Sequence, residues 1–105
     1  MLTPITTIEE LKLAVTHNDI AVVDLYATWC KPCQEMLPVI EELSNQTSVP
    51  FFKVDIDQVP EAKTFTGAKA VPMLYMYKDG RIREFAYGVN DKSKIEMKLK
   101  RVMRV

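Results

Sequence analysis

The chain has 105 residues, of which 48% are hydrophobic and 27% charged, and this composition is that of one globular domain rather than a disordered segment. Fourteen basic side chains balance fourteen acidic ones, so the excess positive charge that a general nucleic-acid binder needs is missing. No apolar run is long enough for a membrane span and the first residues lack a signal-peptide pattern. We therefore expect a single domain over residues 1–105, cytoplasmic and monomeric, with no nucleic-acid or membrane partner.

A helix and a buried strand come first along the chain. Thr7 and Glu10 have the spacing of a capping box, and the apolar residues that follow recur at helical spacing, which predicts a helix over residues 7–17. Residues 20–27 are almost all apolar, a pattern typical of a central strand covered on both faces. The short segment 3–6 can add an edge strand ahead of this helix.

A second helix and a second strand follow. Apolar residues at helical spacing predict a helix over residues 32–45, in which Pro38 removes one backbone donor and should bend the helix. Residues 51–56 form the second strongly apolar strand. The stretch 57–61 then opens a short helix.

The last third of the chain predicts a hairpin and a final helix. Residues 71–78 are a third apolar run, and the Asp79-Gly80 pair is a strong turn signal, so a strand over residues 81–87 should return antiparallel. Asn90 can cap the last helix. The apolar side of that helix carries Ile95, Leu99 and Val102. Parallel strands joined by helices and then an antiparallel hairpin predict an α/β sandwich around a mixed central sheet.

The two cysteines of the chain stand together as Cys30-Lys31-Pro32-Cys33. In a reducing cytosol such a pair is more often redox-active or metal-binding than a structural disulfide. A zinc site needs four ligands, and the chain adds a single histidine, His17, so zinc would have to be shared between subunits. We therefore expect redox chemistry rather than a metal site.

The position of Cys30 suits a reactive thiol. It follows the predicted strand 20–27 and stands at the start of the predicted helix 32–45, where partial positive charge and free N–H groups favour a thiolate. Residues three apart on a helix are neighbours at about 5–6 Å, which suits a disulfide. Cys33 is thus placed to attack a mixed disulfide formed on Cys30.

Asp24 interrupts the apolar run of residues 20–27. A carboxylate in such a run is costly unless it is protonated, paired or hydrogen-bonded. An aspartate at the strand end that faces water is one interpretation. We favour the other, a buried group that accepts and donates a proton near the cysteines, with Lys53 of the neighbouring predicted strand as its candidate partner.

The sequence around the cysteine pair reads Val-Asp-Leu-Tyr-Ala-Thr-Trp-Cys-Lys-Pro-Cys over residues 23–33. Further along stand Pro38, Lys53-Val54-Asp55-Ile56-Asp57, Gly67, Val71-Pro72, Asp79-Gly80 and Gly88. In order and spacing these residues resemble the thioredoxin family over nearly the whole chain. The resemblance implies the thioredoxin fold, in which a central mixed sheet of five strands is flanked by four helices.

The resemblance also implies a role for each site residue. Cys30 would be the nucleophile, Cys33 the buried resolving thiol, and Asp24 the buried proton relay, which Lys53 modulates. The Val71–Pro72 peptide would be cis and would pack against the cysteines, and its backbone would pair with an extended substrate segment. The substrate-binding surface around Cys30 would comprise Trp29, Lys31, Pro32, Ile56, Ala70, Val71, Pro72, Met73, Gly88 and Val89.

The reaction implied by the resemblance is the reduction of disulfides in target proteins. A thioredoxin reductase would recycle the domain with electrons from NADPH, and the domain itself would need no cofactor. Lys31 and Ala70 stand where the family usually has glycine, and Met73 where threonine usually follows the cis proline. These departures leave the chemistry intact and bear on the redox potential and the target preference. Two alternatives stay open: an oxidase or isomerase domain of the same fold, and a binding module in which the cysteines are incidental.

Overall fold

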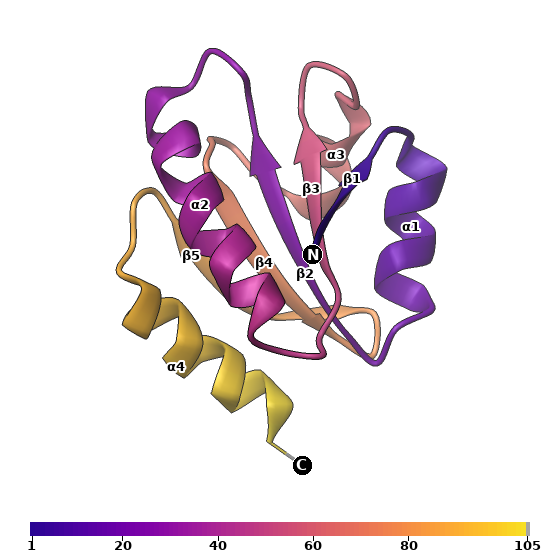
Figure 1. The fold of residues 1–105 in the computed structure, drawn as a ribbon. Helices are drawn as coiled ribbons and strands as arrows, with labels where there is room; N and C mark the ends of the chain where they lie inside the picture. Colours follow the sequence, from indigo (N-terminus) through magenta and orange to yellow (C-terminus); the bar gives the residue numbers. More distant parts are fainter. Residues whose placement is uncertain (105) are drawn as a thin grey trace.

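Five strands form one sheet in the order β1-β3-β2-β4-β5 in the computed structural model, which describes residues 1–104 (Figure 1). The strands are β1 (Leu2–Ile5), β2 (Ile20–Tyr26), β3 (Phe51–Asp55), β4 (Met73–Lys78) and β5 (Arg81–Tyr87). β1 and β2 run parallel to β3, whereas β4 runs antiparallel to β2 and β5. The predicted mixed sheet is confirmed, and so is the edge strand near the N-terminus.

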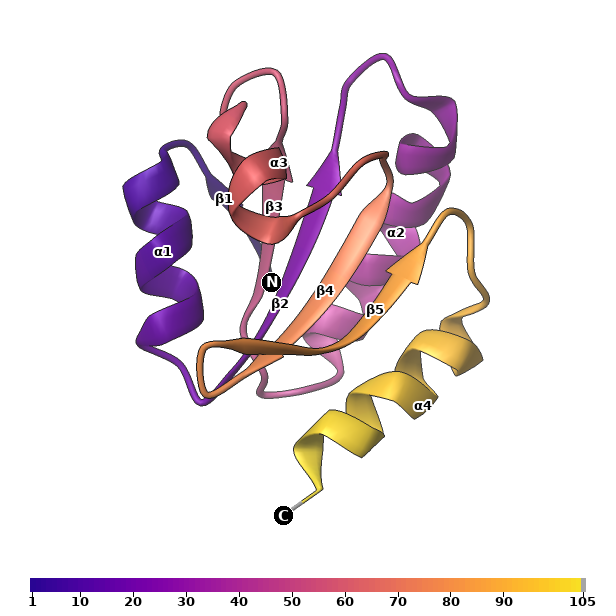
Figure 2. The ribbon, with the colours of Figure 1, turned by 180° about the vertical axis from the view of Figure 1, so that it is seen from behind.

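Helices cover both faces of the sheet (Figures 1 and 2). The helices are α1 (Ile8–Thr16), α2 (Lys31–Asn45), α3 (Glu61–Thr66) and α4 (Lys92–Met103). α1 and α3 lie on one face, where Val23 and Leu25 of β2 are buried, and α2 and α4 lie on the other, where Val22 is buried. Because alternate residues of a strand point to opposite faces, this two-sided cover explains why β2 is apolar throughout. No helix within residues 1–104 is long and apolar enough to cross a membrane.

Local sequence signals account for the start of α1 and for the hairpin. The Thr7 hydroxyl oxygen accepts a hydrogen bond from the Glu10 N–H at 3.1 Å, and a Glu10 carboxylate oxygen accepts one from the Thr7 N–H at 3.0 Å. The predicted capping box is therefore confirmed. At the β4–β5 turn, Asp79 and Gly80 have φ angles of 54° and 79°, the left-handed backbone that a tight hairpin turn requires.

Several predicted boundaries differ from the structure by one residue, and three differences, at α4, β4 and α3, concern how the element begins. The N-cap position of the last helix is Asp91, whose side chain makes no capping hydrogen bond. The Asn90 side chain instead donates hydrogen bonds to the carbonyl oxygens of Tyr87 and Gly88 at 3.0 and 3.1 Å and so fastens the turn after β5. β4 starts at Met73 rather than at residue 71, because a proline has no N–H for a sheet ladder. α3 begins only after a turn over residues 57–60.

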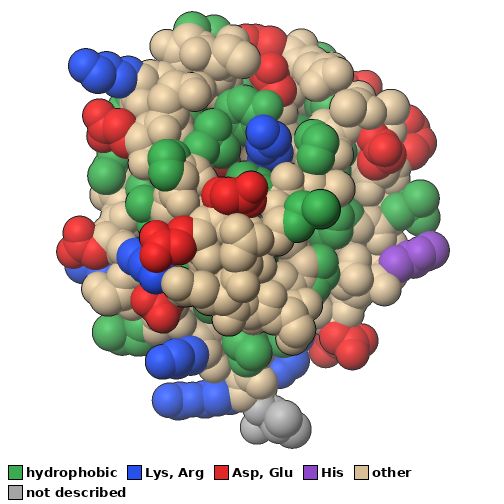
Figure 3. All heavy atoms as spheres, in the orientation of Figure 1, with side chains coloured by type: hydrophobic (Ala, Val, Ile, Leu, Met, Phe, Trp, Pro, Cys, Tyr) green, Lys and Arg blue, Asp and Glu red, His purple; other side chains and the backbone are tan. Residues whose placement is uncertain are grey.

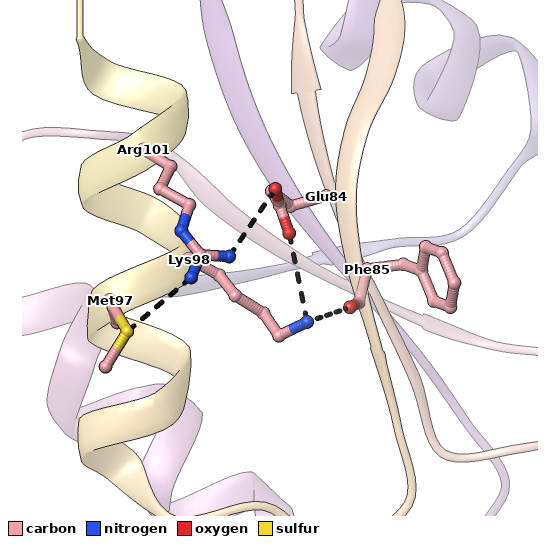
Figure 4. A network of polar contacts seen from close by, with 5 residues as sticks. All are labelled: Glu84, Phe85, Met97, Lys98 and Arg101. Atoms are coloured by element: carbon pink, nitrogen blue, oxygen red, sulfur yellow. Dashed lines mark hydrogen bonds and ion pairs between the residues drawn. The ribbon is translucent and has the colours of Figure 1, made fainter.

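The outer edge of β5 is contacted by α4 (Figure 4). The Lys98 ammonium donates a hydrogen bond to the backbone carbonyl of Phe85 at 3.0 Å and lies 3.8 Å from the Glu84 carboxylate. Arg101 approaches the same carboxylate at 4.0 Å. On the face of the molecule drawn in Figure 3, Lys and Arg side chains gather around the C-terminal end of α4. Because Glu84 faces α4, the alternation of the strand turns Phe85 to the opposite face of the sheet.

Candidate active site

Cys30 and Cys33 lie where β2 ends and α2 begins. Cys30 is the N-cap of α2, and its Sγ atom accepts a hydrogen bond from the backbone N–H of Cys33 at 3.2 Å. The Cα atoms of the two cysteines are 5.2 Å apart and their sulfur atoms form a disulfide. After reduction, the same N–H group and the positive end of the helix favour a thiolate on Cys30.

The two sulfur-bearing residues differ in their access to solvent. Cys33 has no exposed area, whereas 6% of Cys30 is exposed. The Cys30 Sγ atom lies 3.9 Å from the carbonyl oxygen of Val71. Of the two cysteines, only Cys30 therefore has exposed area, and it lies beside the segment that contains Val71.

The Val71–Pro72 peptide is cis, as the resemblance implied. The carbonyl oxygen of Pro72 accepts a hydrogen bond from the Gly88 N–H at 3.0 Å. This bond joins the segment before β4 to the turn after β5. It brings Gly88 and Val89 to the same end of the sheet as the cysteines.

Asp24 lies within β2 and is 1% exposed. Its register partners are Lys53 on β3 and Leu74 on β4. Neither carboxyl oxygen of Asp24 has a hydrogen-bond partner in the described part of the chain. Burial raises the pKa of this carboxyl group to about 8, and the positive charge of Lys53 opposes the shift only in part. The water-facing interpretation is wrong, because this carboxyl group is buried, and its raised pKa leaves it mostly but not entirely protonated at neutral pH.

The surroundings of Asp24 connect it with the cysteine-bearing turn. A gap beside the carboxyl group is lined by Met36 and Pro72, among others, and leaves no space for a water molecule. Met36 stands one helical turn after Cys33, and Pro72 directly follows Val71. Lys53 is half-buried, and its ammonium lies 5.8 Å from the centre of the Tyr26 ring.

The residues expected to bind substrate differ in exposure. Trp29 is 69% exposed, and its indole N–H donates a hydrogen bond to the Asp57 carboxylate at 2.8 Å, which holds the ring at the site. Lys31, Pro32, Ala70 and Val89 are also exposed, Val71, Met73 and Gly88 are half-buried, and Ile56 and Pro72 are buried.

Sequence reasoning assigned no role to Asp57, although a signal was present. Because β2 and β3 are parallel, the residues that follow them come out at the same end of the sheet. Trp29 and Asp57 both follow these strands. A search for donor and acceptor pairs across that end would have found them. Among residues 1–104, no three His, Cys, Asp or Glu side chains gather in a way that could hold a metal ion.

Comparisons with known proteins agree with this geometry. The thioredoxin family model matches residues 3–101. Thioredoxin-1 of Schizosaccharomyces pombe is 37% identical over 101 residues, which cover 95% of this chain and 97% of that protein. Thioredoxin-1 of Saccharomyces cerevisiae is 34% identical over 91 residues, 86% of this chain and 88% of its own. Among solved structures, a single-site mutant of a thioredoxin from Halobacterium salinarum superposes with a TM-score of 0.90 at 29% identity, covering 98% of this chain and 91% of that one.

Proposed function

Because the chain belongs to the thioredoxin family and is a protein-disulfide reductase, we propose that Cys30 attacks the target disulfide and that Cys33 resolves the product. The observation that carries this assignment is the position of Cys30 at the N-cap of α2, with the Cys33 N–H on its sulfur. The difference in exposure between the two cysteines supports the same order of events. The proposed target-binding surface around Cys30 comprises Trp29, Lys31, Pro32, Ile56, Ala70, Val71, Pro72, Met73, Gly88 and Val89.

The first step is attack by the Cys30 thiolate on one sulfur of the target disulfide. A mixed disulfide forms between Cys30 and the target, and the other target sulfur leaves as a thiolate that takes up a proton. The helix N-terminus stabilises the attacking thiolate. Trp29 and the segment around Val71 flank the approach to Cys30, and we assign them to target binding.

The second step is attack by Cys33 on the Sγ atom of Cys30. Cys33 must lose its proton, and Asp24 is the group that we assign as its acceptor, in its ionised form. The Cys30–Cys33 disulfide forms, and the second target sulfur leaves and takes up a proton. Two electrons and two protons have then passed from the dithiol to the target. Lys53 acts on Asp24 through its charge, because it favours the ionised carboxylate.

The oxidised domain has to be reduced again before another cycle. We assign this step to a thioredoxin reductase that draws electrons from NADPH, since the chain offers no redox group besides the cysteine pair. We propose the cytoplasm as the compartment, because NADPH-linked reduction operates there, and we propose that the domain works as a monomer.

Insulin reduction tests this proposal. With NADPH and a thioredoxin reductase, the wild-type protein should reduce the insulin interchain disulfides and consume NADPH in proportion, whereas the Cys30→Ser variant should do neither. A wild-type protein that leaves insulin oxidised would contradict the proposed function. Equilibration with glutathione measures the reduction potential of the cysteine pair and so distinguishes a reductase from the oxidase and isomerase alternatives. A reductase should have a potential of about −270 mV, the value usual for thioredoxins, and an isomerase one of about −180 mV.

A further inference from the structure

Two large side chains on β5 are uncovered. Phe85 and Tyr87 are 57% and 58% exposed and point away from α4. They lie in register with Tyr75 and Met73 of β4, respectively, so all four side chains share one face of the sheet. α3 covers part of this face and stops short of β5 (Figure 2).

These side chains form one wall of an open groove of about 430 Å³. The opposite wall is the segment that contains Lys69 and Ala70. Aliphatic and aromatic atoms make up most of the lining, and Lys69 is the only charged residue that the described part of the chain contributes to it. We call this feature the β5 groove. It is large enough for one or two side chains of a bound polypeptide.

The β5 groove adjoins the chain segment that lies beside the Cys30 sulfur. Val71 lies in the chain between Ala70 and Met73, which both line the groove, and the Val71 carbonyl oxygen is 3.9 Å from the Cys30 Sγ atom. A target in mixed disulfide with Cys30 is therefore held at the mouth of the groove. The mixed disulfide raises the effective concentration of the target segment at the groove. Contacts that are too weak to bind a free peptide can therefore still contribute to binding of the attached target.

We propose that the β5 groove binds an apolar side chain of the target polypeptide, so that the protein prefers target segments with a large apolar residue beside an acidic one. This inference rests on the proposed function and names its substrate class. The occupant is an extended target segment, since residues on both sides of Val71 line the groove and the Val71 carbonyl oxygen lies beside Cys30, the proposed point of attachment. The apolar lining selects the apolar residue, and Lys69 selects the acidic neighbour.

The geometry fixes where the apolar residue should lie in the target. Met73 and Tyr75 stand two and four residues beyond Val71, which is at most about 7 and 13 Å along the chain. An extended target segment that starts at Cys30 covers the same distance with the same number of residues. The preferred apolar residue should therefore lie two to four positions from the reactive cysteine, on one side of it only.

A peptide series tests the position directly on the wild-type protein. Disulfide-linked peptides of Gly and Ser carry one Phe, which is moved from one to four positions away from the cysteine on either side. We expect kcat/KM to rise about ten-fold, equal to about 1.4 kcal/mol, when Phe is two to four positions away on one side. An Asp beside that Phe should raise kcat/KM about two-fold over a Lys. Equal rates for all peptides would overturn the groove proposal and leave the proposed function standing, whereas reduction of none of them would contradict the proposed function itself.

A matched pair of variants tests the groove itself. Phe85→Thr/Tyr87→Thr should lose the ten-fold preference while it reduces glutathione disulfide, which has no apolar side chain, at the wild-type rate. The control is Ile82→Thr, because Ile82 is 40% exposed on the same strand and pairs with Tyr77, away from the groove; it should keep the preference. A double variant that retains the preference would refute the proposal. So would a wild-type dimer in sedimentation that the double variant fails to form, because the groove would then be covered by a second copy.

Discussion

Replacing Asp24 by asparagine should stabilise the folded protein at neutral pH. The Asp24 carboxyl group is buried without hydrogen-bond partners in the described residues, and its pKa is raised to about 8, against about 3.9 in an unfolded chain. The folded state therefore holds the proton more tightly, so the stability that this group contributes below about pH 4 is lost as the pH rises through about 8. At about 1.4 kcal/mol per pKa unit, the loss at pH 7 is about 4 kcal/mol. Asparagine has nearly the same shape and no charge, so Asp24→Asn should recover most of this loss.

Urea unfolding at several pH values measures the effect. The difference in unfolding free energy between Asp24→Asn and the wild type should be small at pH 4, grow with pH, and level off above about pH 8. Asp19→Asn replaces an exposed aspartate and serves as the control, which should show no comparable growth. A difference for Asp24→Asn that stays constant from pH 4 to pH 9 would refute the reasoning, because the benefit would then not come from a buried ionisable group.

The same variant should reduce insulin more slowly than the wild type. Without a carboxylate to accept the Cys33 proton, the mixed disulfide should persist longer and the turnover of insulin should fall. Single-turnover kinetics that follow release of the reduced target measure this step. A release rate equal to that of the wild type would mean that Cys33 loses its proton to another group.

Substitutions at three further places test the assignments: at the cysteine pair, at Lys31 and at Thr7. Cys33→Ser should accumulate mixed disulfides with targets on non-reducing gels while Cys30→Ser accumulates none, and the opposite pattern would reverse the two roles. Lys31→Gln should lower the reduction potential by about 15 mV at low salt, because an ammonium group about 6 Å from a thiolate stabilises the reduced form. The difference in potential should shrink in 1 M salt, which screens the two charges. Equal potentials at low salt would mean that the lysine points away from the sulfur. Thr7→Ala should lower the unfolding free energy by about 1 kcal/mol through loss of the N-cap, and Thr7→Ser should restore it, whereas an unchanged urea midpoint for Thr7→Ala would contradict the capping role.

Features set by neighbours in the chain could be predicted from the sequence. The capping box at Thr7 needs only a partner three residues on, and the Asp79-Gly80 turn needs only two residues that tolerate a left-handed backbone. The apolar run of β2 indicated cover on both faces, and this cover in turn made Asp24 conspicuous. The place of Cys30 at a helix start follows from the order of strand and helix.

Features set by contacts between distant segments could not be predicted in the same way. The sequence does not show that Asp24 lacks hydrogen-bond partners, because that depends on which side chains of α2 and β4 surround it. It also does not show that Phe85 and Tyr87 are uncovered. Aromatic residues in strands ordinarily pack on a half-buried surface, and the exposure of these two side chains follows from the shortness of α3, which ends at Thr66 and leaves β5 open.

Both outer edges of the sheet carry features that hinder the addition of another strand. At one edge the Lys98 ammonium occupies the carbonyl oxygen of Phe85, which an incoming N–H would need. At the other edge β1 has only four residues, one of them Pro4, which has no N–H to donate. Open sheet edges are the usual starting points of aggregation between folded proteins. The sheet of this protein therefore cannot readily be extended by another polypeptide, and we expect concentrated solutions of the folded protein to show no increase in light scattering.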